Sequence, residues 1–287
     1  MAGLGESSEG ARSSRLPAVD GLRGLLALVV MLTHVKVVPD VRSTSWLVEW
    51  LLAQPANLAT CGFFVLSGYV LTRSWDGRFG VFLARRFLRL WPVYALCLAV
   101  GYAIVATPPV WTQFFWYPLL TANSKPAIDP PIWSLCIEAW AMLFMPLIAL
   151  AGKGRIWRAA LLYALAVAAS AYSVKFAFGE YFLIGACLSR WDFRSRLLSA
   201  AGPQWLGRIS YSLYLSHWLV FVLANRYFGG WGVVASIPAA FLVAWVIWRT
   251  VEAPSIRLSR RVDTFGRAVK TRIAAAGANK DASRALG

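Results

Sequence analysis

Long apolar blocks recur between Gly21 and Trp248, and short polar segments separate them. A helix needs about 20 apolar residues to cross a bilayer, with a range of about 17–25. No stretch alternates apolar and polar residues in the manner of a membrane strand. The pattern predicts an all-α fold, a polytopic transmembrane helical bundle of about eight to ten spans. The expected spans are 21–38, 57–72, 88–107, 133–150, 157–174, 176–189, 209–226 and 231–249.

The two ends of the chain differ from this apolar middle. About twenty mixed polar residues precede the first apolar run, and no small-residue cleavage site follows a short apolar core. We expect residues 1–16 to be a flexible cytosolic N-terminus, residues 17–257 the membrane domain, and residues 258–287 a basic cytosolic tail. The first span then acts as an uncleaved signal anchor.

The distribution of charge gives an independent test of this topology. The chain has 29 Lys and Arg residues against 13 Asp and Glu residues, for a net charge of +16. With a cytosolic N-terminus, the eight spans place 24 of the 29 basic residues on the inner side, as the positive-inside rule requires. We expect a multi-pass protein of the cell (inner or plasma) membrane with both termini in the cytosol. The positive charge is then a solvated rim beside membrane lipid, and we expect no nucleic-acid partner.

Several other features have ordinary explanations. All four cysteines fall within apolar segments without metal-ligand spacing, so we expect small buried side chains there. Two distant histidines and the lack of a carboxylate cluster argue against a metal site. The external loop 108–132 is rich in Trp, Phe and Tyr, which fits either an interfacial anchor or a segment that caps an acceptor site.

Ionisable residues inside the first apolar block are the most informative positions. His34 follows Arg23 by eleven residues, so both lie on one helical face, roughly 16 Å apart along the axis. Asp20 projects to much the same side. Ionisable groups in a membrane span usually face a cavity or a partner. A neutral imidazole can act as a general base, although His34 bonded structurally to a neighbouring helix is the alternative.

A run of arginines opens the third span at the cytosolic surface. Arg85 and Arg89 are four residues apart, and Arg86 and Arg89 are three apart, so all three can converge on one side of a helix. Guanidinium groups bind phosphate oxygens in a bidentate manner. The spacing therefore predicts an anion-binding site. The alternative is that these arginines only mark the cytosolic end of the span, as the positive-inside rule describes.

A carboxylate enters the fourth span from the opposite side. Glu138 lies about 7–8 Å into that span by helical rise, and His34 lies about 10 Å from the outer face of a core about 30 Å thick. The two groups are therefore expected at similar depth. A carboxylate beside His34 would orient its tautomer, whereas a local helix hydrogen bond is the plainer role for Glu138.

Two further segments carry polar residues within apolar runs. Ser67 and Gly68 are small residues of the kind that allow close helix packing, and Ser67 lacks the Gly-x-Ser-x-Gly setting of a nucleophile. His217 lies about 12 Å into the seventh span from the cytosolic side. Its position fits either packing or the lining of the same cavity as His34.

Taken in order, these segments resemble the acyltransferase-3 family of integral membrane O-acyltransferases. Each motif is weak alone, but five in sequence at suitable topological positions, over about residues 17–257, form a specific pattern. The matching motifs are Val19-Asp20-Gly21-Leu22-Arg23-Gly24 with His34, Phe63-Phe64-x-x-Ser67-Gly68-Tyr69, Arg85-Arg86-x-x-Arg89-x-x-Pro92-x-Tyr94, Trp133-Ser134-Leu135-x-x-Glu138, Tyr211-Ser212-x-Tyr214-Leu215-x-His217-Trp218, and the closing Val251-Glu252-Ala253-Pro254.

This resemblance implies O-acylation of a sugar, polysaccharide or secondary metabolite, with acyl-CoA, most commonly acetyl-CoA, as cytosolic co-substrate. It implies that His34 and Arg23 are catalytic, that the arginine run contacts the donor, and that Ser67 and Glu138 have roles at the site. The family commonly has a second acid after Trp-Ser-Leu and ten or more spans. Ala139 replaces that acid here, and the short chain indicates a compact member.

The sequence thus predicts a membrane O-acyltransferase with His34 as general base. Arg23 and Glu138 complete its catalytic group, and Arg85, Arg86, Arg89 and Ser67 form the donor site. A proton-coupled small-molecule transporter or flippase is the alternative, with the same polar cavity serving alternating access. Such a transporter would be expected to show paired broken helices in two repeated halves.

Overall fold

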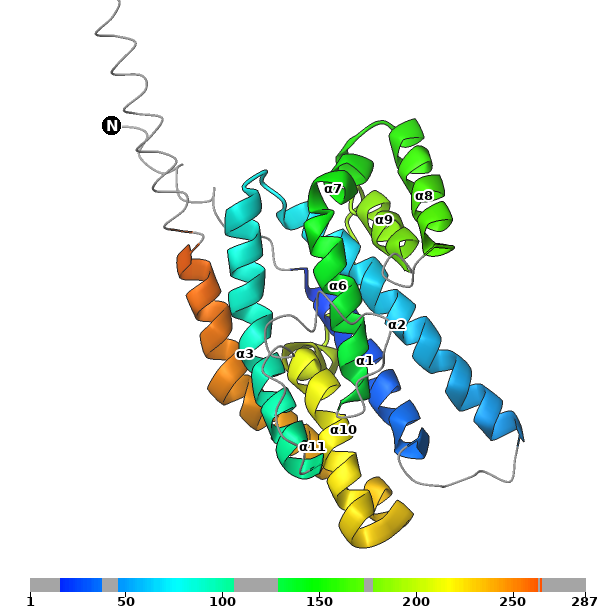
Figure 1. Ribbon diagram of the computed structural model, residues 1–287, viewed down its shortest axis with the longest axis vertical. Coiled ribbons are helices and arrows are strands. Elements are labelled where there is room, and N and C mark those ends of the chain that lie inside the picture. The colour runs from blue at the N-terminus through cyan, green and yellow to red at the C-terminus, as the bar shows by residue number, and fades with distance from the viewer. Residues whose placement is uncertain (1–15, 38–45, 106–128, 173–177, 263, 265–287) are drawn as a thin grey trace, which may run out of the picture.

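The computed structural model describes residues 16–37, 46–105, 129–172, 178–262 and 264. Within these ranges the chain is a bundle of helices without strands, which confirms the predicted all-α class (Figure 1). The elements are α1 (Pro17–Val37), α2 (Trp46–Ser74), α3 (Phe79–Val105), the 3-10 turn η1 (Pro130–Ile132), α6 (Trp133–Leu143), α7 (Met145–Lys153), α8 (Ile156–Ser170), α9 (Gly179–Leu188), α10 (Ala201–Ala235), α11 (Ile237–Ile247) and the π-helical turn η2 (Trp248–Glu252).

Within the described residues, the predicted spans fall on helices, but these helices differ greatly in length. Among the described residues, three segments are long and apolar enough to cross a membrane: Pro17–Val35, Phe79–Val105 and Ile237–Val262. A fourth arises if α6 and α7, bent by 71° at their junction, are counted as one span. The shorter apolar helices α8 and α9 have 15 and 10 residues, or about 22 and 15 Å by helical rise. The helical bundle is therefore confirmed, whereas the number of spans stays a prediction.

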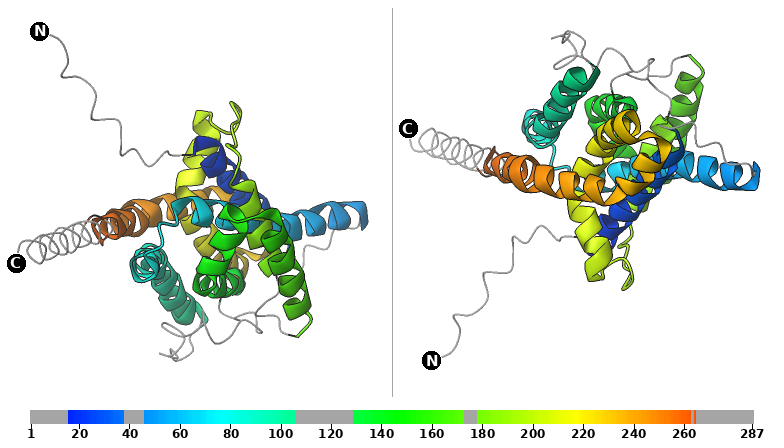
Figure 2. Two further views of the ribbon diagram at one scale, coloured as in Figure 1. Left: turned by 90° about the horizontal axis from the view of Figure 1, so that it is seen from above. Right: turned by 90° about the horizontal axis from the view of Figure 1, so that it is seen from below.

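Helix α1 lies at the centre of the bundle and packs most extensively along α10 (Figure 2). The two backbones meet at a pair of glycines. A Cβ atom on Gly24 would collide with the backbone of Gly207, and one on Gly207 would collide with the backbone of Asp20. Membrane helices pack closely where small residues let backbones approach. The glycines beside Asp20 and Arg23 therefore hold the charged end of α1 against α10.

The second extensive contact, between α2 and α9, has the same construction. A Cβ atom on Gly68 would collide with the backbone of Phe182, and one on Gly185 would collide with the backbone of Val65. Tyr69, the next residue of α2, donates a hydrogen bond of 2.9 Å to the carbonyl of Trp191. The Ser67-Gly68-Tyr69 motif thus anchors α2 to the α9 region with two residues.

Helices α3 and α8 stand on either side of the bent α6–α7 pair in both views of Figure 2. The chain bends at Phe144, and α7 begins directly afterwards with a proline in its first turn. Proline cannot donate the backbone hydrogen bond that would continue α6 without a break. The bend leaves α6 free to approach α2 and α10 with one end, where the candidate site lies.

Candidate functional site

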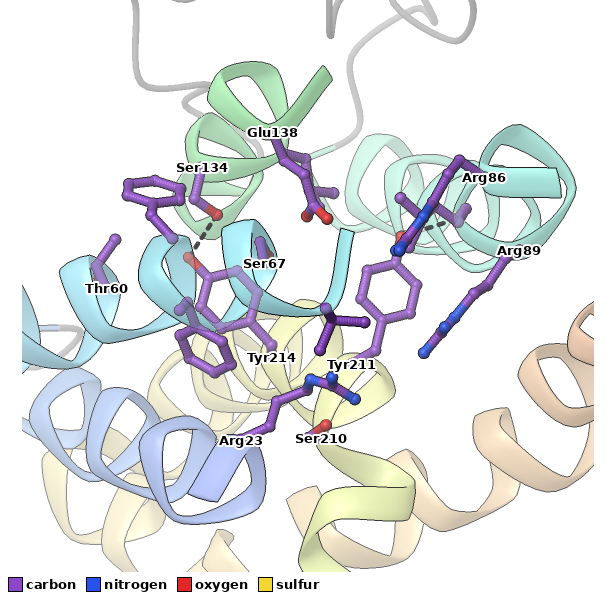
Figure 3. A pocket seen from close by; sticks show the side chains of 15 residues that line it. Arg23, Thr60, Ser67, Arg86, Arg89, Ser134, Glu138, Ser210, Tyr211 and Tyr214 are labelled. Atoms are coloured by element: carbon purple, nitrogen blue, oxygen red, sulfur yellow. Dashed lines mark hydrogen bonds between the residues drawn. The ribbon is translucent and has the colours of Figure 1, made fainter. Parts of the chain in front are cut away.

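A cavity lies where α1, α2, α3, α6 and α10 converge (Figure 3). The volume open to the centre of a water molecule is about 90 Å³. A single bound water needs about 10–15 Å³ of such volume, so the cavity has room for several waters. The lining combines charged groups, hydroxyls and apolar side chains. It consists of Arg23, Thr60, Phe63, Phe64, Ser67, Val70, Arg86, Arg89, Leu90, Ser134, Leu135, Glu138, Ser210, Tyr211 and Tyr214. We call it the arginine cavity.

Three guanidinium groups dominate the charge of this cavity. Arg23 enters from α1, and Arg86 and Arg89 enter from α3, while Glu138 approaches from α6 on another side (Figure 3). Arg23 also pairs with Asp20 one turn earlier, at 3.1 Å. Three cations face one lining carboxylate, so the cavity suits an anionic ligand with more than one negative oxygen. The structure thus brings together four of the residues singled out in the sequence.

The arginine run contributes unequally. Arg86 and Arg89 line the cavity, but Arg85 is not among its lining residues. Whether Arg85 also contacts the donor stays a prediction. Residues 85 and 86 point about 100° apart on a helix, and position 89 lies between them. The cavity faces the side shared by Arg86 and Arg89.

A hydrogen bond joins α10 to α3, the helix that carries Arg86 and Arg89. Tyr211 donates from its hydroxyl to the carbonyl of Leu90 at 2.7 Å, one residue beyond Arg89. Both Tyr211 and Leu90 also line the cavity. The tyrosine of the Tyr211-Ser212 motif therefore positions α3 and its arginines, a role that the sequence pattern did not reveal.

The opposite wall of the cavity is set by Ser134 and Tyr214. The Ser134 hydroxyl donates to the carbonyl of Pro131 at 3.1 Å and lies 2.7 Å from the hydroxyl of Tyr214. Since the serine proton is used, the tyrosine donates in the second bond. This chain of bonds links α6 to α10. Ser67 lines the same cavity from α2, and its contact with the donor stays a prediction.

The start of α6 is itself buried. Asp129, directly before the 3-10 turn, is fully buried, and neither of its carboxyl oxygens accepts a hydrogen bond within the described part of the chain. Burial raises the pKa of the Asp129 carboxyl well above its usual range. A protonated carboxyl avoids the large penalty of a buried charge. Burial therefore favours the uncharged form of Asp129.

His34 does not line the arginine cavity and instead pairs with His217. Nδ1 of His34 lies 2.9 Å from Nε2 of His217, and the two rings are tilted by only 23°. Nδ1 of His217 lies 2.8 Å from the carbonyl oxygen of Leu213, one turn earlier on α10. His217 is fully buried, whereas His34 is half-buried. We call His34 and His217 the histidine pair.

Tyr214 connects the histidine pair with the arginine cavity. It lines the cavity, and its ring centre lies 6.3 Å from that of His217. Phe63, another lining residue, packs edge-on against Tyr214 at 5.5 Å. Trp218 and Phe221 close the other sides of the pair by edge-on contacts with His34 and His217 respectively. The two histidines predicted separately are thus one unit, adjacent to the cavity wall.

Glu138 and His34 are found in neighbouring parts of the site. Glu138 lines the arginine cavity, whereas Nδ1 of His34 is engaged by His217. Whether Glu138 also orients His34 or the acceptor stays a prediction. The structure assigns the position next to His34 Nδ1 to another histidine.

The closing Glu252 has a partner on α10. Ser212 donates to the Glu252 carboxylate at 2.6 Å, and both side chains are buried. Glu252 lies in the π-helical turn that follows α11, so this bond ties that turn to the Tyr211-Ser212 motif. No group of three or more potential metal ligands occurs among the described residues.

Comparison with known proteins gives a family assignment. The Acyltransferase domain model, Acyl_transf_3, matches residues 16–203, about two thirds of the chain. This chain belongs to the acyltransferase-3 family. The match includes Arg23, His34, Ser67, the arginine run and Glu138, and the apolar helices agree with a membrane acyltransferase domain. Helix α10, which carries Tyr214 and His217, lies almost entirely beyond the matched residues.

The chain also resembles a protein from Rhizobium radiobacter known as "Protein 2 in picA locus". The two are 33% identical over 95 residues, which is 30% of this chain and 44% of that protein. The matched segment therefore spans less than half of that relative. No solved structure matches the chain significantly.

Proposed function

We propose that this acyltransferase-3 protein moves an acyl group from acyl-CoA to a hydroxyl group of a sugar, polysaccharide or secondary metabolite. The observation that carries the proposal is the arginine cavity within the acyltransferase domain. Three arginines from two helices surround a space that water can enter, directly beside the helix that bears His34. No other charged residue besides Glu138 is among the lining residues.

The donor is assigned to this cavity by charge and shape. The phosphates of CoA carry several anionic oxygens, and guanidinium forks bind such groups in a bidentate manner. Arg86 and Arg89 extend from one face of α3, and Arg23 faces them from α1. Arg23 and His34 are both on the uninterrupted helix α1, roughly 16 Å apart along its axis. A donor held at Arg23 therefore extends along α1, past Phe63 and Tyr214, to bring its thioester to His34.

Chemistry takes place at His34 in this proposal. Its unprotonated ring nitrogen removes the proton from the acceptor hydroxyl, and the oxygen attacks the thioester carbonyl carbon. The carbon–sulfur bond breaks, and the imidazolium returns its proton to the leaving thiolate. Acyl-CoA and alcohol thus become ester and free CoA, with His34 restored. Glu138 and Ser67 contact the bound substrates as cavity-lining groups.

The proposed topology places these steps in order across the membrane. Both termini are cytosolic, so the arginine-bearing beginning of α3 faces the cytosol, where acyl-CoA is made available. The excess of basic residues on that side supports this orientation. The protein is then a multi-pass protein of the cell membrane. The acceptor reaches His34 from the end of α1 opposite to Arg23.

The test is direct release of CoA by purified protein in lipid nanodiscs. Acetyl-CoA and longer acyl-CoA donors are supplied with a panel of hydroxylated acceptors, and free thiol is measured with time. Mass spectrometry of extracts from cells with and without the gene identifies the acceptor by a missing acyl increment. Loss of both signals in the His34→Ala variant is expected. Acyl transfer at the full rate by His34→Ala would overturn the role of His34.

A further inference from the structure

The histidine pair has one bond whose direction is fixed by chemistry. Nδ1 of His217 faces the carbonyl oxygen of Leu213 at 2.8 Å, and a carbonyl can only accept. The proton of that bond therefore sits on Nδ1 of His217. Burial disfavours a second proton, because a charged ring with no exposed surface inside the bundle would lose its hydration. His217 is thus neutral, and its Nε2 carries a lone pair.

That lone pair determines the state of His34. Nε2 of His217 can only accept, so the 2.9 Å contact requires a proton on Nδ1 of His34. A neutral His34 with a protonated Nδ1 carries its lone pair on Nε2. The carbonyl of Leu213 thereby sets, through two rings, which nitrogen of His34 is basic. This carbonyl belongs to the backbone of α10. Helix α10 is held close to α1 at Gly24 and Gly207, so the distance between the two histidines is fixed by helix packing.

We infer that His217 is a positioning residue that holds His34 in the Nδ1-protonated tautomer, so that Nε2 of His34 is the atom that accepts the proton of the acceptor hydroxyl. This inference rests on the proposed function. During the reaction His34 gains a proton on Nε2, and its Nδ1 proton stays in the bond to His217. The neutral acceptor on His217 stabilises the transient imidazolium, a task that a carboxylate performs in other histidine-containing sites. His217 itself gains and loses no proton.

The surroundings of the pair fit this role. Trp218 contacts His34 edge-on at 5.4 Å, and Phe221 contacts His217 edge-on at 5.8 Å, so aromatic rings restrict the orientation of both imidazoles. The hydroxyl of Tyr214, whose ring lies 6.3 Å from that of His217, is engaged with Ser134 at 2.7 Å. The ring geometry is therefore set by packing as well as by hydrogen bonds.

The kinetic test compares two replacements of His217 in the full-length protein. Gln retains an acceptor oxygen near the position of Nε2, whereas Phe fills similar space without an acceptor. We expect His217→Phe to lower kcat about 100-fold, with little change in the KM for acyl-CoA, because a misplaced catalytic group loses about that factor. His217→Gln should recover at least about tenfold of that loss. Equal kcat values for the two variants would overturn the inference.

Two further variants separate positioning from packing. Val233→Ala loosens the buried packing of α10 at a residue that takes part in neither hydrogen bond of the histidine pair, so its kcat should stay within about threefold of the parent. The double variant His34→Ala/His217→Phe should be no slower than His34→Ala, since residues that act as one unit are not additive. Additive losses would mean that His217 acts independently of His34. Monodispersity and thermal unfolding are compared for every variant.

A spectroscopic readout is independent of enzyme activity. The chain contains only two histidines, so selective ¹⁵N-histidine labelling with a histidine-free tag gives signals from two rings. At neutral pH, both rings should show a protonated Nδ1 and an unprotonated Nε2, and the His217→Gln variant assigns them. A proton on Nε2 of His34 would overturn the inference even if the protein proves to be an acyltransferase. If this tautomer is found but no acyl transfer is detected, the proposed function alone fails.

Discussion

The arginine cavity and the histidine pair share helices α1 and α10, yet they are built on different principles. The cavity presents three cations to a space that water enters. The rings of the histidine pair pack edge-on against Trp218 and Phe221, and their hydrogen-bond geometry is specific. A charged cavity tolerates small displacements because electrostatic attraction varies gradually with distance. A proton acceptor does not, because it has to be within hydrogen-bond reach of the reacting group.

This contrast predicts a separation in kinetic parameters. Substitutions in the cavity should act chiefly on the KM of the donor, and substitutions in the histidine pair should act chiefly on kcat. The close contact of α1 and α10 at Gly24 and Gly207 supports both regions. A substitution that disrupts this contact should therefore impair donor binding and catalysis together. The predictions below begin with that contact, where the largest effect is expected.

Gly24→Leu should prevent stable folding, because the new side chain would collide with the backbone of Leu206 and Gly207. Overpacking against a rigid neighbour costs about 3 kcal/mol or more. The measurement is the yield of monodisperse protein together with its thermal unfolding. Gly80→Leu is the matched control, since a Cβ at Gly80 meets no neighbouring atom within 4 Å. A Gly24→Leu protein as stable as this control would contradict the close crossing.

His34→Ala should lower kcat by about 10³-fold, within the range of general-base contributions of about 10²–10⁴. The KM for acyl-CoA should change little, because His34 does not line the arginine cavity. CoA release under saturating donor provides kcat, and the same series at varied donor concentration provides KM. A large rise in KM with unchanged kcat would place donor binding, rather than chemistry, at His34.

Arg86→Ala and Arg89→Ala should each raise the KM for acyl-CoA about tenfold or more. Each removes a charged hydrogen-bond partner, worth about 1.5–3 kcal/mol. Their kcat at saturating donor should remain within a few-fold of the parent. Direct binding of CoA, measured by calorimetry, should weaken in parallel with the rise in KM. An unchanged KM in both variants would move the donor site away from the arginine cavity.

Arg85→Ala should have the smallest effect and serves as the control for the two preceding variants. Arg85 belongs to the same run but is not a lining residue. We expect the KM for acyl-CoA to change less than about threefold, in keeping with the weak effect of a charge outside the site. A tenfold rise would show that the charge of the whole run, rather than the cavity geometry, holds the donor.

Whether a feature of this arrangement could be predicted from the sequence depends on how far apart in the chain the contacting residues are. The helical class and the shared face of Arg23 and His34 follow from local periodicity, which a single helix preserves. The contribution of Arg86 and Arg89 was also predictable from their spacing. Local spacing could not separate Arg85 from them, because the choice depends on which helices pack against α3.

The contacts that were missed are those between distant segments. The bond between His34 and His217 joins residues 183 positions apart, and no periodicity encodes it. The depth estimate for Glu138 could not reveal that Nδ1 of His34 contacts another histidine, because depth along one helix says nothing about which helix packs beside it. The bonds of Tyr211 to Leu90 and of Ser212 to Glu252 likewise required the tertiary structure.

Helix α1 carries a guanidinium and an imidazole on one rigid rod without interruption. Under the proposed function, the rise of roughly 16 Å between Arg23 and His34 sets how long a donor must be for its anionic end to contact Arg23 while its thioester reaches His34. Thioesters of small thiols, which lack a distant anionic end, would then reach His34 without contacting Arg23. The spacing along one helix would thus make the carrier, and not only the acyl group, a determinant of selectivity.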